Sequence, residues 1–341
     1  MKKTLTFIIF LFLSLEGLFS TNYYQGKLSK NEIALYSTIS TALLSEINVI
    51  DIDPSFTKDE VNQVNEAMFK DLPQLFFVNQ SYNYAWSQTS SGKKVSATLT
   101  YTFKDYPDDI STTREIVERR IMDIVDTLDT LSTDAQKIEV IYRYFALTRN
   151  YDASLVDDQS CYSVLINKRG VCASYARSFQ YIMIYLDIPN IYVTGTLYGV
   201  SHAWNMIEID NKWYHVDVTN GNTGFADYCT YQYLLIPTSK MEQSVLIENK
   251  SLLPLAYSDD YNYYKNNDLY ITSFNEDDLD SKIKEAISNK RNGITFEFKT
   301  DQLLSKSKIY LIDEQNIYDL IGKNNIIYNI EEGRKLLTIH F

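Results

Sequence analysis

The chain has 341 residues, 45% hydrophobic and 22% charged, which is ordinary for a globular protein of two or three packed units and excludes global disorder. Its 44 acidic and 32 basic residues give a net charge of −12, and no basic cluster stands out, so we expect no nucleic-acid partner. With three histidines, no close Cys/His spacing and no calcium-type loop, we also expect no metal and no cofactor.

The first 20 residues are typical of a secretory signal peptide. Lys2 and Lys3 precede an apolar run, Leu5 to Leu15, which is too short to span a bilayer. Ser20 is a small residue suited to cleavage, although the residue two positions earlier is not small, and an uncleaved anchor is the alternative. No later apolar stretch is long enough to cross a membrane. We therefore predict a secreted, periplasmic or cell-surface protein with no stable span apart from this segment.

Residues 21–110 are predicted to form a small mixed α/β unit. The pattern from Asn31 to Asp71 is helical, and Thr57 followed by Glu60 is a capping-box signal. The stretch from Leu75 to Tyr106 then alternates, which indicates antiparallel strands around a Ser-Ser-Gly turn.

Residues 111–250 are predicted to form a domain of helices followed by consecutive strands. One helix has an apolar stripe, and the next begins at Thr133 with Gln136 in the reciprocal capping position. A third begins beside Cys172 and turns apolar residues inward, namely Tyr175, Phe179, Ile182, Met183 and Leu186. The strand-like runs are Ile191–Leu197, His202–Ile209 and Trp213–Val218. This order indicates an α+β core with an antiparallel sheet.

Residues 255–341 are predicted to form a small C-terminal α/β module. A helix is expected over Asp277–Ser288, and strands are expected over Ile294–Phe298, Ile309–Ile312 and Leu336–Phe341. The module contains no cysteine and a single histidine, His340, so we expect it to have no catalytic role.

The loop that ends at Gly170 places Cys172 at the start of a strong helix. Unpaired N–H groups and the helix dipole favour a thiolate there. Gly170 is expected to turn tightly and leave space for a substrate to reach the sulfur. The alternative is that Cys172 is a small buried hydrophobic residue. Three cysteines leave at least one unpaired, and a disulfide between Cys161 and Cys229 stays open.

The two strands after this helix bring a base and an acid together. Asp210-Asn211 is a turn dipeptide, and if Ile209 pairs with Lys212, Asp217 lies opposite Trp204. His202 is then its diagonal neighbour on the same face, about 7–8 Å away at the backbone, which is close enough for an imidazole to meet a carboxylate. The pattern predicts Cys172 as nucleophile, His202 as base and Asp217 as the orienting acid.

His215 is a rival base, because the same register places it on that face, opposite Met206. It lies two residues from Asp217 on one strand, where the two side chains project in parallel. A cross-strand hydrogen bond suits His202 better, and His215 is then expected to be a half-exposed strand residue.

These residues resemble the transglutaminase-like superfamily. The resemblance covers about Ile138 to Pro237 and rests on four motifs: "GVC" at 170–172, "DIP" at 187–189, "HAW" at 202–204 and "WYHVDVT" at 213–219. Asp71–Val78 and the C-terminal module are weakly similar to regions that flank this domain in exported bacterial proteins. The sequence departs from the family at Asp187, where Gly is usual, and at Val218-Thr219-Asn220, where Pro and an aromatic are common.

The resemblance implies a fold in which a helix bearing the cysteine packs on an antiparallel sheet. It also implies papain-like acyl transfer from a protein or peptide amide through a thioester, by an acyltransferase, amidase or peptidase. The Cys172 N–H is one natural oxyanion donor. Gln159, Tyr162 and Trp204 are candidates for the second donor or for the substrate rim. The alternative function is an inactive surface or cell-wall binding module of the same fold. Oligomeric state and substrate stay open.

Overall fold

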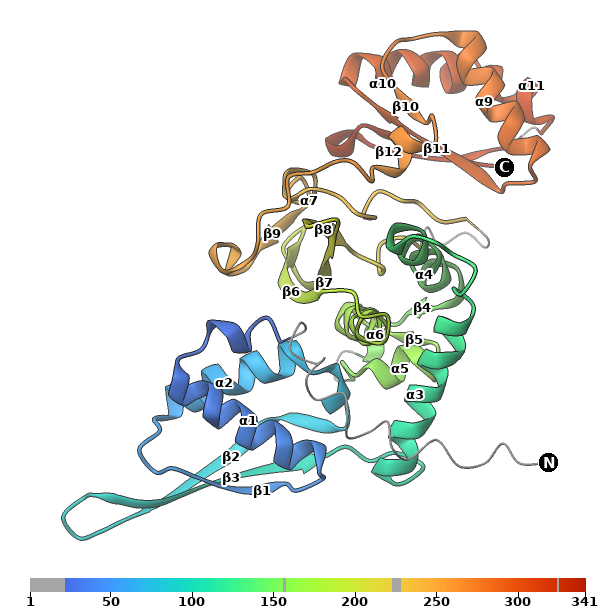
Figure 1. Cartoon of the computed structure of the whole chain (residues 1–341). Coiled ribbons are helices and arrows are strands. Elements are labelled where there is room, and N and C mark those ends of the chain that lie inside the picture. Colours follow the sequence, from blue (N-terminus) through green and yellow to red (C-terminus); the bar gives the residue numbers. More distant parts are fainter. Residues whose placement is uncertain (1–21, 156–157, 223–227, 324) are drawn as a thin grey trace, which may run out of the picture. The chain divides into compact units, whose positions relative to one another are not determined.

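The computed structural model describes residues 22–155, 158–222, 228–323 and 325–341 (Figure 1). The chain packs into two compact units, one of Met1–Thr130 with Asp152–Val193 and one of Leu131–Tyr151 with Thr194–Phe341. Both units combine helices with mainly antiparallel strands, so the fold is α+β. The predicted signal peptide lies outside the described residues.

The N-terminal part of the first unit is a three-stranded antiparallel sheet with two main helices. Its elements are η2 (Gln25–Lys27), α1 (Lys30–Leu44), β1 (Val49–Ile52), α2 (Lys58–Asp71), η3 (Pro73–Leu75), β2 (Val78–Gln88) and β3 (Lys94–Phe103), with strand order β1-β3-β2. The prediction of one helical stretch over Asn31–Asp71 was wrong in its middle. The reason is that β1 pairs with β3 and buries Ile50 and Ile52 in alternation. The capping box of Thr57 and Glu60 is confirmed.

The rest of the first unit is helical and carries Cys172. Its elements are α3 (Ile110–Asp126), η4 (Ala153–Leu155), α5 (Cys161–Leu165), the short β5 (Arg169–Gly170) and α6 (Cys172–Tyr185). Helix α6 is almost fully enclosed, because every residue from 173 to 183 is buried. The predicted inward face is therefore confirmed, except that Leu186 is only half-buried where the helix ends. The Ser178 hydroxyl donates to the Cys161 carbonyl at 3.2 Å, which ties α6 to α5.

The second unit contains a helix and a four-stranded sheet with the order β8-β7-β6-β9. The elements are α4 (Asp134–Thr148), β4 (Asn150–Tyr151), β6 (Asn190–Leu197), β7 (Val200–Ile209), β8 (Lys212–Val216), α7 (Thr238–Met241), β9 (Val245–Ile247) and η5 (Lys250–Leu252). The three predicted strand runs are confirmed, except that the third ends at Val216 and not at Val218. The capping box of Thr133 and Gln136 at the start of α4 is also confirmed.

The C-terminal part of this unit has its own sheet, with the order β10-β11-β13-β12. Its elements are α8 (Tyr263–Asn266), β10 (Tyr270–Ile271), α9 (Glu276–Ser288), β11 (Gly293–Phe298), α10 (Asp301–Lys308), η6 (Ile309–Asp313), α11 (Asn316–Ile321), β12 (Ile327–Glu331), η7 (Glu332–Arg334) and β13 (Leu336–His340). The strand predicted over Ile309–Ile312 was wrong. These residues form a π-helical turn that continues α10 and buries Leu311 and Ile312 in the module's core.

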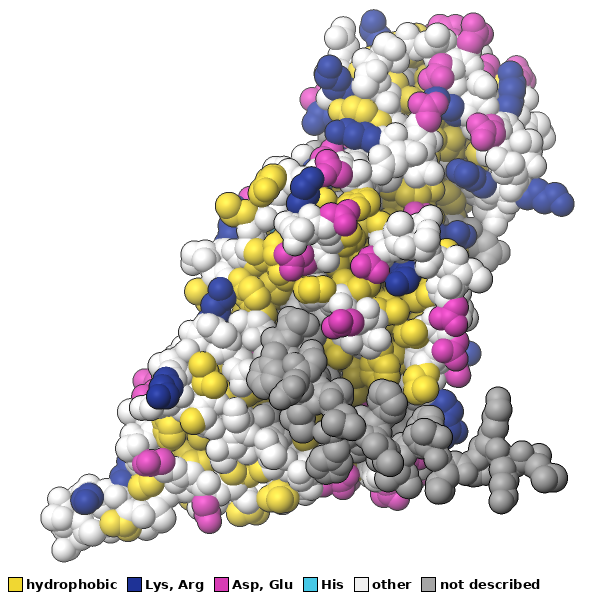
Figure 2. All heavy atoms as spheres, viewed as in Figure 1, with side chains coloured by type: hydrophobic (Ala, Val, Ile, Leu, Met, Phe, Trp, Pro, Cys, Tyr) yellow, Lys and Arg dark blue, Asp and Glu magenta, His cyan; other side chains and the backbone are white. Residues whose placement is uncertain are grey.

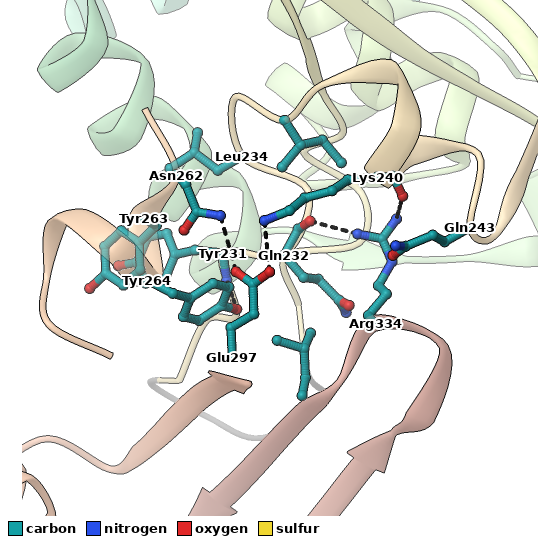
Figure 3. A pocket seen from close by; sticks show the side chains of 12 residues that line it. Tyr231, Gln232, Leu234, Lys240, Gln243, Asn262, Tyr263, Tyr264, Glu297 and Arg334 are labelled. Carbon is teal, nitrogen blue, oxygen red and sulfur yellow. Dashed lines mark hydrogen bonds and ion pairs between the residues drawn. The ribbon is translucent and has the colours of Figure 1, made fainter. Parts of the chain in front are cut away.

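A polar cluster joins this module to the segment that follows β8 (Figure 3). The Arg334 guanidinium donates to the carbonyls of Gln232 at 2.8 Å and Lys240 at 3.1 Å, and it lies 3.9 Å from the centre of the Tyr233 ring. Glu297 accepts a 2.7 Å hydrogen bond from the Lys240 ammonium. These contacts hold residues 232–240, a segment whose backbone also bonds to that of His215 and Asp217.

On the face shown in Figure 2, Lys and Arg side chains are interspersed with Asp and Glu. Within the described ranges, no helix has the length and apolar character needed to cross a membrane.

Candidate active site

A buried histidine–carboxylate pair lies on the β7–β8 hairpin. His202 projects from β7, and Asp217 lies immediately after β8. The His202 Nε2 atom is 2.7 Å from Asp217 Oδ2, and both residues are buried. A bond of this length between an imidazole and a carboxylate is typical of a charge-assisted hydrogen bond.

The turn chemistry of the hairpin produces this pair. Asp210 and Asn211 both take positive φ angles, 51° and 60°, as a two-residue hairpin turn requires. Ile209 pairs with Lys212, so the predicted register is confirmed along the hairpin as far as Asn205 opposite Val216. Beyond the last pair, the Asp217 N–H donates to the Tyr233 carbonyl at 3.0 Å, which fixes the backbone of the acid.

Asp217 remains ionised although it is fully enclosed. Burial alone would raise the pKa of its carboxyl group, but the charge and hydrogen bond of His202 oppose this effect. Hydrogen bonds from the Asn220 side chain and the Thr219 N–H act in the same direction, and the pKa is held below its ordinary value. Because Asp217 accepts the Nε2–H proton, Nδ1 is the ring nitrogen of neutral His202 that can act as a base.

His215 faces a different environment, although it has the predicted position opposite Met206. It is 1% exposed, so the expectation of a half-exposed residue was wrong. The Trp204 indole N–H donates to its Nδ1 at 2.9 Å, and its Nε2 is 3.0 Å from the Thr238 hydroxyl. Burial, with a smaller contribution from Lys250, lowers its pKa to about 3. His215 is therefore a neutral core residue, and its two nitrogens are engaged.

Trp204 packs between the two histidines. It is 1% exposed, and its ring stacks on His202 with 6.0 Å between centroids and 17° between planes. The expectation that Trp204 lines the substrate rim does not fit this placement, because its only polar atom bonds to His215 in the core. Gly195 is required beside it, since a Cβ atom there would come within 2.9 Å of the indole and 2.2 Å of the Leu246 carbonyl oxygen.

Cys172 is the first residue of α6 in the first unit, and it is half-buried. The N-cap residue, Val171, provides no side-chain cap for this helix end. The partial positive charge of the first helical turn favours the thiolate form of Cys172. The explanation predicted for Gly170 needs correction. A Cβ atom added at this position would come within 2.7 Å of Val164 and 2.9 Å of Ser163, so close packing on α5 requires the glycine.

The other two cysteine side chains are buried. Burial raises the pKa of Cys161 and that of Cys229 to about 12 each. All three cysteines lie within the described residues, and Cys161 and Cys229 form no disulfide.

The structure brings His202, Trp204 and Asp217 together in the second unit, whereas Cys172, Gln159 and Tyr162 belong to the first. Gln159 is exposed in the loop before α5. Tyr162 is half-buried on α5, with its ring 4.7 Å from that of Tyr106. Their roles as oxyanion donor or rim residue stay predictions.

Sequence reasoning missed the role of Asn220. Its side-chain amide donates to Asp217 Oδ2 at 2.6 Å and lies 3.3 Å from His202 Nε2. The available signal was an amide residue three positions after the acid, in a polar turn.

Comparison with known proteins relates one region of the chain to an enzyme superfamily. Residues 123–218 match the family model of the Transglutaminase-like superfamily. This region, which contains Cys172, His202 and Asp217, is therefore similar to the domain of a superfamily of thiol-dependent enzymes. No curated protein matches its sequence.

Several solved structures are similar over part of the chain. A TGase is 13% identical over 54% of this chain and 54% of its own, with a TM-score of 0.30. A proposed cysteine protease from Cytophaga hutchinsonii is 14% identical over 50% and 66%, with a TM-score of 0.30. The periplasmic domain of TgpA from Pseudomonas aeruginosa is 15% identical over 39% and 58%, with a TM-score of 0.27. The chain therefore spans about half to two thirds of these relatives.

Proposed function

We propose that the protein is an extracytoplasmic thiol-dependent acyltransferase, amidase or peptidase that acts on protein or peptide amides. Cys172 is the nucleophile, His202 the general base and Asp217 the residue that orients the base. The observation that carries this proposal is the buried 2.7 Å bond between His202 Nε2 and Asp217. A carboxylate in this position fixes the ring tautomer and stabilises the imidazolium that forms when a thiol loses its proton.

The first half-reaction forms a thioester. The Cys172 thiol proton moves to His202 Nδ1, and the sulfur bonds to the carbonyl carbon of the substrate amide while the π electrons move to oxygen. When this intermediate collapses, the C–N bond breaks and the leaving amine takes the proton from the imidazolium. General-base assistance of this kind contributes about 10²–10⁴-fold to a rate.

The second half-reaction releases the acyl group. Water or an amine attacks the thioester carbon and gives a proton to His202 Nδ1. The C–S bond then breaks, and the departing sulfur regains that proton. Water gives hydrolysis and an amine gives a new amide bond, so both outcomes use the same residues. The Cys172 N–H and a group from Gln159 or Tyr162 would stabilise the oxyanion in each half.

Alkylation of the three cysteines tests the proposal within one molecule. We expect iodoacetamide to modify Cys172 at least about 10-fold faster than Cys161 and Cys229, whose thiols are buried. His202→Ala should remove most of this advantage, whereas His215→Gln should retain it. Equal modification of the three thiols in the folded protein would overturn the enzyme proposal and leave the binding module. A mass-spectrometric search for an acyl group on Cys172 after incubation with peptide mixtures then identifies the substrate class.

The location outside the cytoplasm rests on the first 20 residues. The N-terminus of the protein recovered from its native host tests this proposal directly. A mature chain that begins just after Ser20 supports cleavage and export. A chain that retains the apolar run in a membrane fraction supports the anchor.

A further inference from the structure

Asn220 contacts both members of the histidine–carboxylate pair. Its Nδ2 atom is 2.6 Å from Asp217 Oδ2, the oxygen that also accepts from His202 Nε2. The other carboxylate oxygen, Oδ1, accepts a 3.0 Å hydrogen bond from the Thr219 N–H. The carboxylate therefore receives hydrogen bonds from three donors, His202 on β7 and the nearby Thr219 and Asn220.

The chemistry of this contact fixes the direction of the hydrogen bond. An ionised carboxylate only accepts, so the side of the Asn220 amide that faces it must be the NH₂ group. Two N–H donors, from Asn220 and from His202, thus converge on one oxygen. The 3.3 Å separation between Asn220 Nδ2 and His202 Nε2 follows from this shared acceptor.

The backbone around Asn220 is held on both sides. On the N-terminal side, the Asp217 N–H is bonded to the Tyr233 carbonyl. On the C-terminal side, Gly221 packs against α4, where an added Cβ atom would come within 2.7 Å of the Tyr142 ring. The Gly221 carbonyl also accepts from the Thr230 N–H at 3.1 Å. The amide is therefore preorganised on a fixed turn.

We infer that Asn220 is a positioning residue that lowers the basicity of His202 by sharing the Asp217 carboxylate with it. This inference rests on the proposed function, in which His202 is the general base. A carboxylate oxygen that accepts a second hydrogen bond is a weaker acceptor for the imidazolium proton. The imidazolium of His202 is then stabilised less than it would be by Asp217 alone, and it releases its proton to the leaving amine more readily.

Two other groups close to Asp217 carry no charge that would alter the pair. Two phenols, those of Tyr142 and Tyr233, also interact electrostatically with Asp217. Burial raises the pKa of Tyr142 well above its usual range and that of Tyr233 to about 12, so both stay neutral. The Trp204 ring, which stacks on His202, does not titrate.

The test is the pKa of His202 itself, measured by NMR titration of the imidazole nitrogens in a chain with only three histidines. In Asn220→Leu, which keeps the approximate shape without the donor, we expect the pKa of His202 to rise by about one unit. The matched control is Asn222→Leu, because the Asn222 amide bonds to the Arg149 carbonyl. The control should leave the pKa of His202 unchanged.

Asn220→Ala keeps the test valid if the leucine variant does not fold. It also removes the donor, with a smaller side chain, and it too should raise the pKa of His202. An unchanged pKa in a folded variant of either kind would overturn the inference. A purely structural Asn220 would lower stability without moving this pKa. Because the measurement needs no turnover, a shifted pKa with no effect on Cys172 alkylation would refute the proposed function and leave the role of Asn220 standing.

Discussion

The two histidines of the β7–β8 hairpin occupy contrasting environments. His202 is bonded to a carboxylate at 2.7 Å, whereas His215 is bonded to a neutral indole N–H and lies beside a hydroxyl group. Both are buried, and Trp204 packs against both rings. Burial alone therefore does not separate a base from a core residue.

What separates the two residues is the charge of the partner. An anionic partner compensates the desolvation of an imidazolium, so His202 can gain and release a proton in an enclosed site. His215 has no such compensation from Trp204 or Thr238, and its pKa falls to about 3. The four predictions below test this contrast.

The largest effect is expected from Asp217→Asn, which removes the negative charge and would make the environment of His202 similar to that of His215. The amide can still hold the ring, but it can no longer stabilise the imidazolium. We expect the rate of acyl-enzyme formation on Cys172 to fall by about 10³–10⁴-fold, as for other catalytic histidines that lose their carboxylate. Circular dichroism confirms that the variant is folded. A loss of less than 10-fold would show that Asp217 has a structural role only.

Replacing His215 should affect stability instead. In His215→Leu the Trp204 N–H loses its buried acceptor, which costs about 2–3 kcal/mol of unfolding free energy. In His215→Gln an amide oxygen and an NH₂ group can replace Nδ1 and Nε2, so the loss should be smaller. Urea unfolding measures both values. If the folded glutamine variant loses the rapid alkylation of Cys172, His215 is not only a core residue and the contrast between the two histidines is contradicted.

The pH dependence of stability should also report on His215. The unfolded chain takes a proton on this residue near pH 6.5, whereas the folded chain does not until about pH 3. Stability is therefore complete above pH 6.5 and falls as the pH drops through this window, by up to about 1.4 kcal/mol per pH unit. Asp71, whose pKa burial raises to about 7, has the opposite sign. The quantity to measure is thus the difference between the wild type and His215→Gln, which should shrink steadily between pH 6.5 and pH 4. A constant difference would contradict the neutral, buried state of His215.

The local signals of the sequence predicted much of this fold. The Asp210-Asn211 turn determined the hairpin register, and capping boxes correctly located the starts of two helices. The errors arose where tertiary pairing overrides local pattern. Val49–Ile52 becomes a strand because β3 offers an unpaired edge, and Ile309–Ile312 stays helical because it continues α10 over the module's core.

The site was predicted less completely, for a related reason. Strand parity placed His202, His215 and Asp217 on one face, but it cannot distinguish a charged partner from a neutral one. The contact of Asn220 with Asp217 depends on how the turn after β8 folds back. No periodic pattern in the sequence predicts the conformation of such a turn. Likewise, the buried state of Trp204 follows from its bond to His215 and its packing on Gly195.

The smallest effect is expected from Thr238→Val, which removes the hydroxyl beside His215 while keeping the side-chain shape. The Trp204 N–H fixes the proton of neutral His215 on Nε2, so Thr238 accepts from that atom at 3.0 Å. A cavity of about 290 Å³ borders both residues, and a water molecule there can replace the lost acceptor. We therefore expect a loss of only about 1 kcal/mol in urea unfolding, with the alkylation rate of Cys172 unchanged. Thr238→Ser, which keeps the hydroxyl, is the control and should lose less. A large loss of Cys172 reactivity in the valine variant would mean that the environment of His215 reaches the base, and that the two histidines are not independent.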